Sequence, residues 1–389
     1  MSMSTSTDAE RTAVPDSAGT RNPTLDLIAN IFQAGIQLTG AMPTDVILSP
    51  GRPAQLQVSG RLVSLDLAAL SPNDTARIAG DLCGKNERAL KRLAEEGSCD
   101  VSLSLPKLAR LRPQIFRQRG TYVIAIRVGR TVIPDFASLN LPAQLADITR
   151  LEHGLVLVAG GPGSGKSSTM AALIDRINEN CSYNIVTLEN PVEFLHLHKK
   201  SLVHQRELHS DVPSYELGMQ SALKQGARVV MISELADRHT ADLALMAADS
   251  GRLVISSMET ANVVRAAERM VSFFPAEEHR RIRGLMSRSF RYFIAQQLLP
   301  GREGGRVPIF EILKSTSRAR QLLERSDDWN VLADAINKGN LEDVQTFEQE
   351  LERLIRRGVI SLDTGLRHSG YPDILRMELS DVREDVNGS

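Results

Sequence analysis

Cysteine, long apolar runs and an excess of charge are all scarce in this chain. It has three cysteines in 389 residues, and the separations of Cys83, Cys99 and Cys181 match neither a metal site nor a disulfide framework. No apolar run approaches the roughly 18 residues that a membrane span needs, and the polar N-terminus lacks the apolar core of a secretion signal. We therefore expect a protein of the reducing cytoplasm that has no membrane span of its own.

The balance of charge excludes a further class of partner. The chain has 46 basic and 47 acidic side chains, so it has no overall basic field that would hold nucleic acid. It also lacks the aromatic side chains interleaved with basic ones on which single strands stack. We expect no nucleic-acid partner, and this argues against an ATPase that handles DNA.

The most informative motif present is a phosphate-binding loop. Residues 160–167 read Gly-Gly-Pro-Gly-Ser-Gly-Lys-Ser, which has the form GxxxxGK[ST]. An apolar strand is expected before it at 155–158, and a helix with one apolar face after it at 168–178. Backbone N–H groups of such a loop, and of the helix that it opens, cradle phosphates.

Two side chains of the loop have specific tasks. Lys166 supplies a cation to the β- and γ-phosphates, and the hydroxyl of Ser167 supplies a ligand to Mg²⁺. The expected cofactors are therefore ATP and Mg²⁺. The residues expected to hold the nucleotide are Gly160, Gly161, Pro162, Gly163, Ser164, Gly165, Lys166, Ser167 and Ser168.

The N-terminal part of the chain predicts a tail followed by a small domain. Residues 1–23 are polar and without periodicity, so we expect them to be disordered. Residues 24–143 predict an α+β domain, in which Ser71 caps a helix that has Pro72 at its first position. Residues 139–151 are expected to connect this domain to the next.

The second part, 150–385, predicts an α/β nucleotide-binding domain with a helical C-terminal region from about residue 310. Short apolar strands alternate with helices, which is the pattern of a parallel sheet with right-handed crossovers. The expected strands are 155–158, 184–187, 229–232 and 253–256.

Two acids follow expected strands directly, Glu189 and Glu234. Ligands of open parallel sheets sit at the carboxyl ends of the strands, so both carboxylates should converge on the ligand of the loop. We expect Glu234 to position the attacking water, and Glu189, with Glu193, to act on the metal directly or through its waters. A helix N-cap or first-turn charge is the alternative for such an acid.

Other charged and titratable groups leave two readings open. Arginines recur along the strands expected at 108–116 and 121–128, either as a solvated basic face or as cations aimed at a nucleotide on another domain or subunit.

Four histidines, at 196, 198, 204 and 209, have no acid or cysteine that completes a metal-site spacing, so we expect surface or hydrogen-bonding histidines.

From about residue 24 to 385 the chain resembles the secretion-type hexameric ATPases, and most closely the type IV pilus retraction ATPase family of the PilT/PilU group. The resemblance begins with the loop and its helix, 154–178. The other stretches that carry it are Thr187-Leu-Glu-Asn-Pro-Val-Glu-Phe, Gln205-Arg-Glu, Phe274-Pro-Ala, Gln296-Gln-Leu, Val344-Gln-Thr-Phe-Glu-Gln, and Arg110-Leu-Arg followed by Gln118-Arg-Gly.

The resemblance implies a PAS-like N-terminal domain before a RecA-like P-loop ATPase domain. It implies a ring, either a homo-hexamer or a mixed ring with a paralogous ATPase, with ATP at its internal boundaries. Arg112, Arg119 and Arg127 match the arginines that reach the phosphates in that family. The ring would act from the cytoplasm on an inner-membrane platform protein of the pilus machine, and would pull pilin subunits out of the fibre.

The chain departs from the family's pattern at several positions. Asn190 replaces an Asp, Ala227 and Arg228 replace Pro-Asp, Ser233 replaces Gly, Ala236 replaces Arg, and Arg252 and Glu259 replace two histidines. A carboxylate at 259 held ~5 Å from a γ-phosphate oxygen would repel it by about 3 kcal/mol at an effective dielectric of ~20. One hypothesis is that Arg228 or Arg252, cations in the same motifs, neutralises this charge. The other is that the charge stays unneutralised and weakens ATP binding.

Three functions therefore remain open. The first is a motor subunit that powers or assists pilus retraction and twitching motility by hydrolysing ATP. The second is a nucleotide-binding, weakly hydrolysing or non-hydrolysing subunit that accompanies an active paralogue. The third is an ATPase of a type II or type IV secretion system. The intact Lys166-Ser167 pair argues against a ring component that never binds nucleotide.

Overall fold

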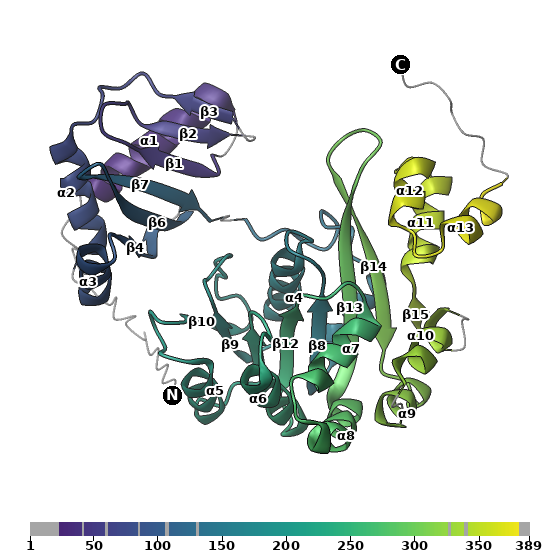
Figure 1. Cartoon of the computed structure of the whole chain (residues 1–389). Coiled ribbons are helices and arrows are strands. Elements are labelled where there is room, and N and C mark those ends of the chain that lie inside the picture. The colour runs from purple at the N-terminus through teal and green to yellow at the C-terminus, as the bar shows by residue number, and fades with distance from the viewer. Residues whose placement is uncertain are drawn as a thin grey trace, which may run out of the picture. The chain divides into compact units, whose positions relative to one another are not determined.

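The computed structural model describes residues 23–40, 43–58, 61–84, 86–105, 109–129, 132–325, 328–337 and 341–380. The chain forms two compact units, Met1–Gly129 and Arg130–Ser389 (Figure 1). Residues 1–22 of the expected N-terminal tail lie outside the described residues. Among the helices of the described ranges, none combines the length and the hydropathy that a bilayer crossing requires.

The first unit is an antiparallel sheet packed with helices. Its strand order is β3-β2-β1-β7-β6-β4, and β5 pairs with β6. Buried and half-buried residues alternate along β1 and β2, as expected for strands with one face on a core. The elements are α1 (Pro23–Thr39), β1 (Asp45–Leu48), β2 (Gln55–Val58), β3 (Arg61–Ser64), α2 (Pro72–Cys83), α3 (Glu87–Glu95), β4 (Ser98–Asp100), β5 (Leu103–Leu105), β6 (Ala109–Gln118) and β7 (Thr121–Val128).

The helix predicted to begin at Ser71 does so. The Ser71 side chain accepts from the backbone N–H of Asp74, and the Asp74 carboxylate accepts from the backbone N–H of Ser71. Pro72 occupies the first turn, where its missing N–H costs nothing. This capping box fixes where α2 starts from four consecutive residues alone.

The second unit is built on an eight-stranded sheet of order β10-β9-β11-β12-β8-β13-β14-β15. The first six strands in this order, β10 through β13, are all parallel to one another. β14 is antiparallel to β13, and β15 is antiparallel to β14. The strands are β8 (Gly154–Ala159), β9 (Asn184–Glu189), β10 (Leu202–Glu207), β11 (Val229–Ile232), β12 (Leu253–Met258), β13 (Phe290–Pro300), β14 (Arg306–Lys314) and β15 (Val344–Gln345).

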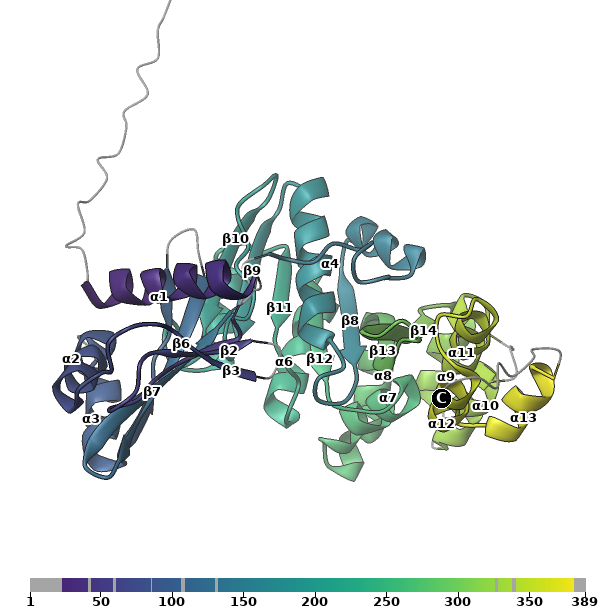
Figure 2. The ribbon, with the colours of Figure 1, turned by 90° about the horizontal axis from the view of Figure 1, so that it is seen from above.

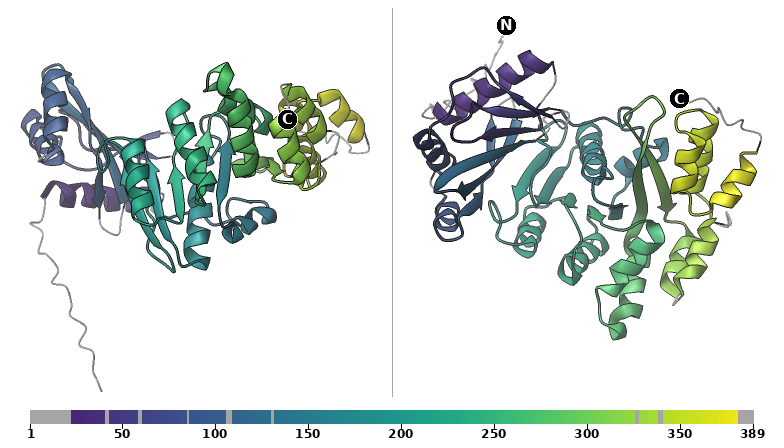
Figure 3. Two further views of the ribbon diagram at one scale, coloured as in Figure 1. Left: turned by 90° about the horizontal axis from the view of Figure 1, so that it is seen from below. Right: turned by 45° about the horizontal axis from the view of Figure 1, so that its top comes forward.

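Helices cover both faces of this sheet. One core joins the strands to α4 and to the 3₁₀ helix η1, and a second joins them to α5, α6, α7 and α8 (Figures 2 and 3). All six residues of β8 are buried, which is why that strand is a continuous apolar run. These elements are η1 (Ala143–Arg150), α4 (Lys166–Asn180), α5 (Tyr215–Lys224), α6 (Arg238–Asp249), α7 (Val263–Ser272), η2 (Ala276–Glu278) and α8 (His279–Ser289).

Residues 132–150 pack with the second unit. Leu145 and Ile148 of η1 are fully buried in the core that α4 and β8 share. The segment that the sequence assigns to a connector is therefore part of the nucleotide-binding unit, and the division between the units lies at Gly129 and Arg130.

The β13–β14 hairpin was not predicted from the sequence. β13 runs parallel to β8, and β14 returns antiparallel to it, so the region expected to be helical from residue 310 begins as a strand. Helices follow only after Lys314. They are α9 (Ser317–Arg325), α10 (Trp329–Asn337), α11 (Phe347–Arg356), α12 (Leu362–His368) and α13 (Pro372–Glu378).

Candidate nucleotide-binding site

The phosphate-binding loop connects β8 to α4 and packs closely on β13. Gly165 precedes α4 with φ 93°, a left-handed conformation that suits glycine. A Cβ on Gly165 would lie 2.7 Å from Nε2 of Gln296, and a Cβ on Gly160 would lie 2.6 Å from the Gln296 carbonyl oxygen. Thr169 also donates to Oε1 of Gln296 across 2.6 Å. Gln296, on a strand that was not predicted, thus supports the loop and its helix.

Lys166 is folded against its own loop. Its Nζ donates to the carbonyl oxygens of Gly160 and Gly161, at 2.8 and 3.0 Å, and lies 4.0 Å from Oε1 of Glu259. Burial lowers the pKa of Lys166, although the carboxylates of Glu259, Glu234 and Glu193 oppose that change. The Lys166 amine therefore lies among three carboxylates that favour its charged form.

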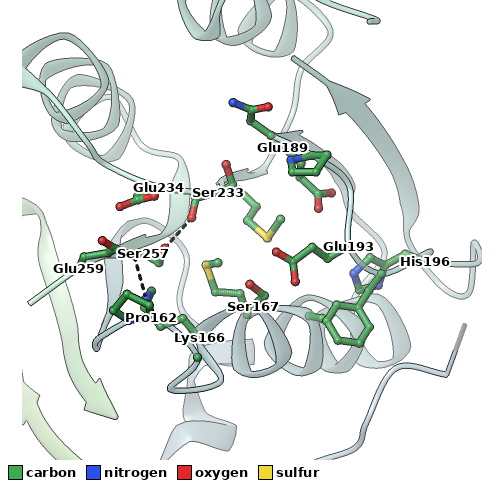
Figure 4. A pocket seen from close by; sticks show the side chains of 17 residues that line it. Pro162, Lys166, Ser167, Glu189, Glu193, His196, Ser233, Glu234, Ser257 and Glu259 are labelled. Carbon is green, nitrogen blue, oxygen red and sulfur yellow. Dashed lines mark hydrogen bonds and ion pairs between the residues drawn. The ribbon is translucent and has the colours of Figure 1, made fainter. Parts of the chain in front are cut away.

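A cavity of about 310 Å³ opens above the loop (Figure 4). It lies at the carboxyl ends of β9, β11 and β12, where the parallel strands of the sheet end together. Of the residues predicted from the sequence to act in the site, Pro162, Gly163, Lys166, Ser167, Glu189, Glu193 and Glu234 line it. Asn190, His196, Ser233, Ser257 and Glu259 also line it.

Glu189 is the most buried acid of the cavity, with 5% of its surface exposed. Thr187 Oγ1 and Gln205 Nε2 both donate to its Oε1, at 2.6 and 3.0 Å. Burial raises the pKa of Glu189, and these hydrogen bonds oppose the rise. Gln205 also donates to the Phe194 carbonyl and accepts from the His196 N–H. It therefore holds the acid and the loop after β9 together.

Glu234 is half-buried and follows β11. Its neighbour Ser233 is held on both sides, because Tyr215 hydrogen-bonds the Ser233 hydroxyl at 2.8 Å and Ser257 donates to the Ser233 carbonyl at 2.6 Å. The Leu235 N–H donates to the carbonyl of Ser257 across 2.8 Å. The backbone that presents Glu234 to the cavity is thus fixed to the end of β12.

His196, which the sequence predicted to be a surface or hydrogen-bonding histidine, is buried and lines the cavity. Its side chain is 2% exposed, and its Nδ1 lies 3.9 Å from Oδ1 of Asp175 on α4. Burial would raise the pKa of Asp175, but His196 and Lys199 lower it on balance. His198, by contrast, accepts from the Val203 N–H. Within the described ranges, no three His, Cys, Asp or Glu residues group as a metal site would require. Only the spatial closeness of α4 could have identified His196.

The two arginines considered as partners of Glu259 lie at the opposite end of the sheet. Arg228 and Arg252 precede β11 and β12, and Arg228 hydrogen-bonds the Gly251 carbonyl. Glu259 follows the six residues of β12, which at ~3.3 Å per residue span about 20 Å. The hypothesis of a pair with Arg228 or Arg252 is therefore wrong, and Lys166 is the cation that lies 4.0 Å from the Glu259 carboxylate.

The three arginines that the resemblance assigns to the phosphates lie in the first unit. Arg112 on β6 is opposite Arg127 on β7, and Arg119 occupies the turn between these strands with φ 50°. Arg127 has an acidic partner far away in the sequence, because its Nε lies 3.3 Å from Oδ1 of Asp45. Arg119 is exposed.

The residues around the cavity fit a magnesium nucleotide. The loop offers backbone N–H groups at the start of α4, and the buried hydroxyl of Ser164 has no hydrogen-bond partner. Ser167 and the carboxylates of Glu189, Glu193 and Glu234 line the same cavity. The three carboxylates do not cluster as direct ligands of one ion, but their oxygens can accept from the waters that Mg²⁺ usually keeps. A phosphate cradle and a set of oxygen donors therefore face one another across one cavity.

Comparison with known proteins connects this site to a family. The family model "Type II/IV secretion system protein" matches residues 137–304. The chain is 32% identical over 335 residues to "Type IV pilus ATPase PilU" of Pseudomonas aeruginosa, which covers 86% of this chain and 87% of that protein. It is also 32% identical to the type IV pilus retraction ATPase PilT of that organism, over 85% of this chain and 95% of that one.

A solved structure is similar across both units. The crystal structure of the pilus retraction motor PilT with bound ADP has a TM-score of 0.81 and 32% identity, over 91% of this chain and 98% of that chain. The expected α/β fold, a smaller N-terminal domain before a RecA-like ATPase domain, is confirmed.

Proposed function

The chain belongs to the family of the type IV pilus ATPases PilT and PilU, and we propose that it is an ATP-binding motor subunit of a type IV pilus machine that powers or assists retraction. Its family makes it an ATPase. The observation that carries the proposal is the placement of Lys166 and Ser167 at the start of α4, directly across one cavity from Glu189 and Glu234. A phosphate site and groups able to orient water and metal are thereby combined.

Each residue has a defined task in this proposal. The loop N–H groups and Lys166 hold the phosphates, and Ser167 holds Mg²⁺. When bound, the metal neutralises charge that develops on the phosphates. Glu189 and Glu193 hold waters of the metal. Glu234, on its fixed backbone, orients the attacking water.

We propose that a ring supplies further positive charge to the cavity. Among the described residues that line the cavity, Lys166 is the one lysine or arginine, and it faces four carboxylates. Further positive charge near the phosphates must come from elsewhere. We propose that Arg112, Arg119 and Arg127 provide it across a boundary of a homo-hexamer, or of a mixed ring with a paralogue. The ring would act from the cytoplasm, at the inner membrane, on the platform protein.

A second candidate is favoured by a specific contact. Lys166 is paired with Glu259, and Asn190 stands at the edge of the cavity where the resemblance leads one to expect an acid. Both features fit a subunit that binds nucleotide but hydrolyses it weakly beside an active paralogue. An ATPase of a secretion system would have the same site. Deleting the gene and observing whether pilus retraction or secretion is lost distinguishes that alternative from a pilus motor.

Direct nucleotide binding by the purified chain tests the proposal. Titration calorimetry with ATP and Mg²⁺ should show binding that Lys166→Ala abolishes, because the substitution removes the loop's cation. Equal affinity of both proteins would overturn the assignment. Steady-state hydrolysis then separates the two candidates, since binding with no turnover favours the accessory subunit.

A further inference from the structure

Glu259 lies where the nucleotide's terminal phosphates would meet Lys166. Its Oε1 is 4.0 Å from Nζ of Lys166, and the two side chains are 46% and 12% exposed. It is the first residue after β12, and β12 is a direct neighbour of β8. The contact therefore follows from the order of the strands, since Glu259 directly follows β12 and the loop that leads to Lys166 leaves β8 at the same end.

The backbone that carries Glu259 is fastened on both sides. The carbonyl of Met258, the preceding residue, accepts from the N–H of Gly160 at the start of the loop across 3.2 Å. The carbonyl of Glu259 itself accepts from Nη1 of Arg269 on α7, across 2.9 Å. The carboxylate can therefore turn about its side-chain bonds while the backbone beneath it stays in place.

The amine of Lys166 has internal partners for its donors. An ammonium has three N–H donors, and two of them are directed to the carbonyls of Gly160 and Gly161. Glu259 supplies the anion of the pair. A phosphate that approaches Lys166 must displace this carboxylate or lie beside it, and both cost binding free energy.

We propose that Glu259 is an internal counter-ion that competes with the terminal phosphates of a nucleotide for Lys166. This inference rests on the proposed nucleotide-binding function and adds a selectivity to it. The competition grows with the charge brought to Lys166, which reaches β- and γ-phosphates and leaves the α-phosphate to the loop backbone. The Glu259 carboxylate therefore lowers the affinity for nucleoside triphosphates most, that for diphosphates less, and that for monophosphates least.

The test compares Glu259→Gln with the wild type in the full-length protein. The substitution keeps the length of the side chain and removes its charge. Calorimetric titration with ATP, ADP and AMP, each with Mg²⁺, should show ATP binding about tenfold tighter in the variant, with a smaller gain for ADP and none for AMP. The gain should shrink as salt increases, because half-exposed charges are screened. If the ratio of ATP affinity to AMP affinity is the same in the variant and the wild type, the proposal is overturned.

Two further proteins separate this mechanism from others. Glu268→Gln removes an acid that pairs with Arg265 on α7, and should leave all three affinities unchanged. Lys166→Ala combined with Glu259→Gln should bind no better than Lys166→Ala alone, since no cation is left to compete for. A full Glu259 effect in the absence of Lys166 would overturn the competition. If wild type and Lys166→Ala bind equally, the nucleotide site itself is wrong, which is a different failure.

Discussion

Gln205 holds Glu189 from the neighbouring strand, because its Nε2 donates to Oε1 of the carboxylate across 3.0 Å. Thr187 donates to the same oxygen. Burial raises the pKa of Glu189, and the two donors limit that rise. The pH range over which this acid is ionised is thus controlled by two residues that do not line the cavity.

Thr187→Val should move the acid side of the pH–rate profile to higher pH. The substitution keeps the shape of the side chain and removes one donor, so the pKa of Glu189 rises further and its charge is lost at a higher pH as the solution is acidified. ATP turnover measured across pH gives the shift. Ser256→Ala removes a buried hydroxyl of β12 that bonds the Ile232 carbonyl, and should not move the profile. Identical profiles for Thr187→Val and wild type would remove Glu189 from the chemistry.

Glu234→Gln should leave ATP affinity unchanged and lower turnover by at least about a hundredfold, the typical contribution of a group that orients or deprotonates water. Nucleotide titration and phosphate release measure the two effects separately. Glu216→Gln, an acid of α5 paired with His239, is the matched control. Turnover at the wild-type rate would mean that the water is held elsewhere.

Gly165→Ala should destabilise the loop by roughly 1–3 kcal/mol and weaken nucleotide binding. The new Cβ would meet Gln296 at 2.7 Å, on a backbone whose φ of 93° already disfavours any side chain. Gly161→Ala is the control for stability without ATP, because nothing lies within 4 Å of its Cβ and its φ is not in the left-handed region. Thermal unfolding with and without ATP measures both changes. Equal melting temperatures would show that the loop is not packed on β13.

Glu311→Gln should reduce the loss of stability between about pH 4.5 and 7. Burial raises the pKa of Glu311 from 4.5 to about 7, with a smaller contribution from Glu348. The folded chain therefore keeps this proton where the unfolded chain releases it, and up to about 3 kcal/mol of stability is lost as pH rises through this range. Glutamine keeps the oxygen that accepts from the Val263 N–H. Denaturant unfolding at pH 5 and pH 8 should show that the free energy of unfolding changes less with pH in the variant than in the wild type. An equal change in both proteins would contradict the prediction.

Mixing Arg119→Ala protein with Lys166→Ala protein should recover ATP turnover that each lacks alone. If Arg119 of one subunit serves the loop of the next, a mixed ring contains boundaries at which both residues are intact. Turnover of the mixture should rise above the sum of the two separate proteins. A sum with no excess would place Arg119 in the same subunit as the loop that it serves, or outside the site.

Local patterns allowed the fold to be predicted where they are self-contained. The phosphate-binding loop, the cap at Ser71 and the buried β8 each depend on a few consecutive residues. β13 was missed, although its apolar and aromatic residues favour a strand. The role of Gln296 was missed for the same reason, because it depends on β13 lying beside β8.

The errors in the site have one physical origin. Sequence motifs suggested that Arg252 and Glu259 act together, but a strand between two residues places them at opposite ends of a sheet. The real partners, Lys166 and Glu259, are brought together by the pairing of β8 with β12. Arg127 and Asp45 are likewise joined by the pairing of β7 with β1. Pairings of this kind depend on which strands become neighbours, and that is decided over the whole domain.

The loop's attachment to strands on both sides of β8 has a thermodynamic consequence. Met258 of β12 holds Gly160, and Gln296 of β13 holds Thr169, through hydrogen bonds that lie wholly within the protein. The phosphate cradle is thus preorganised, so a nucleotide does not have to pay the conformational entropy of ordering it. Calorimetry should therefore find little entropic penalty from the protein, and differences in affinity among nucleotides should arise mainly from electrostatics.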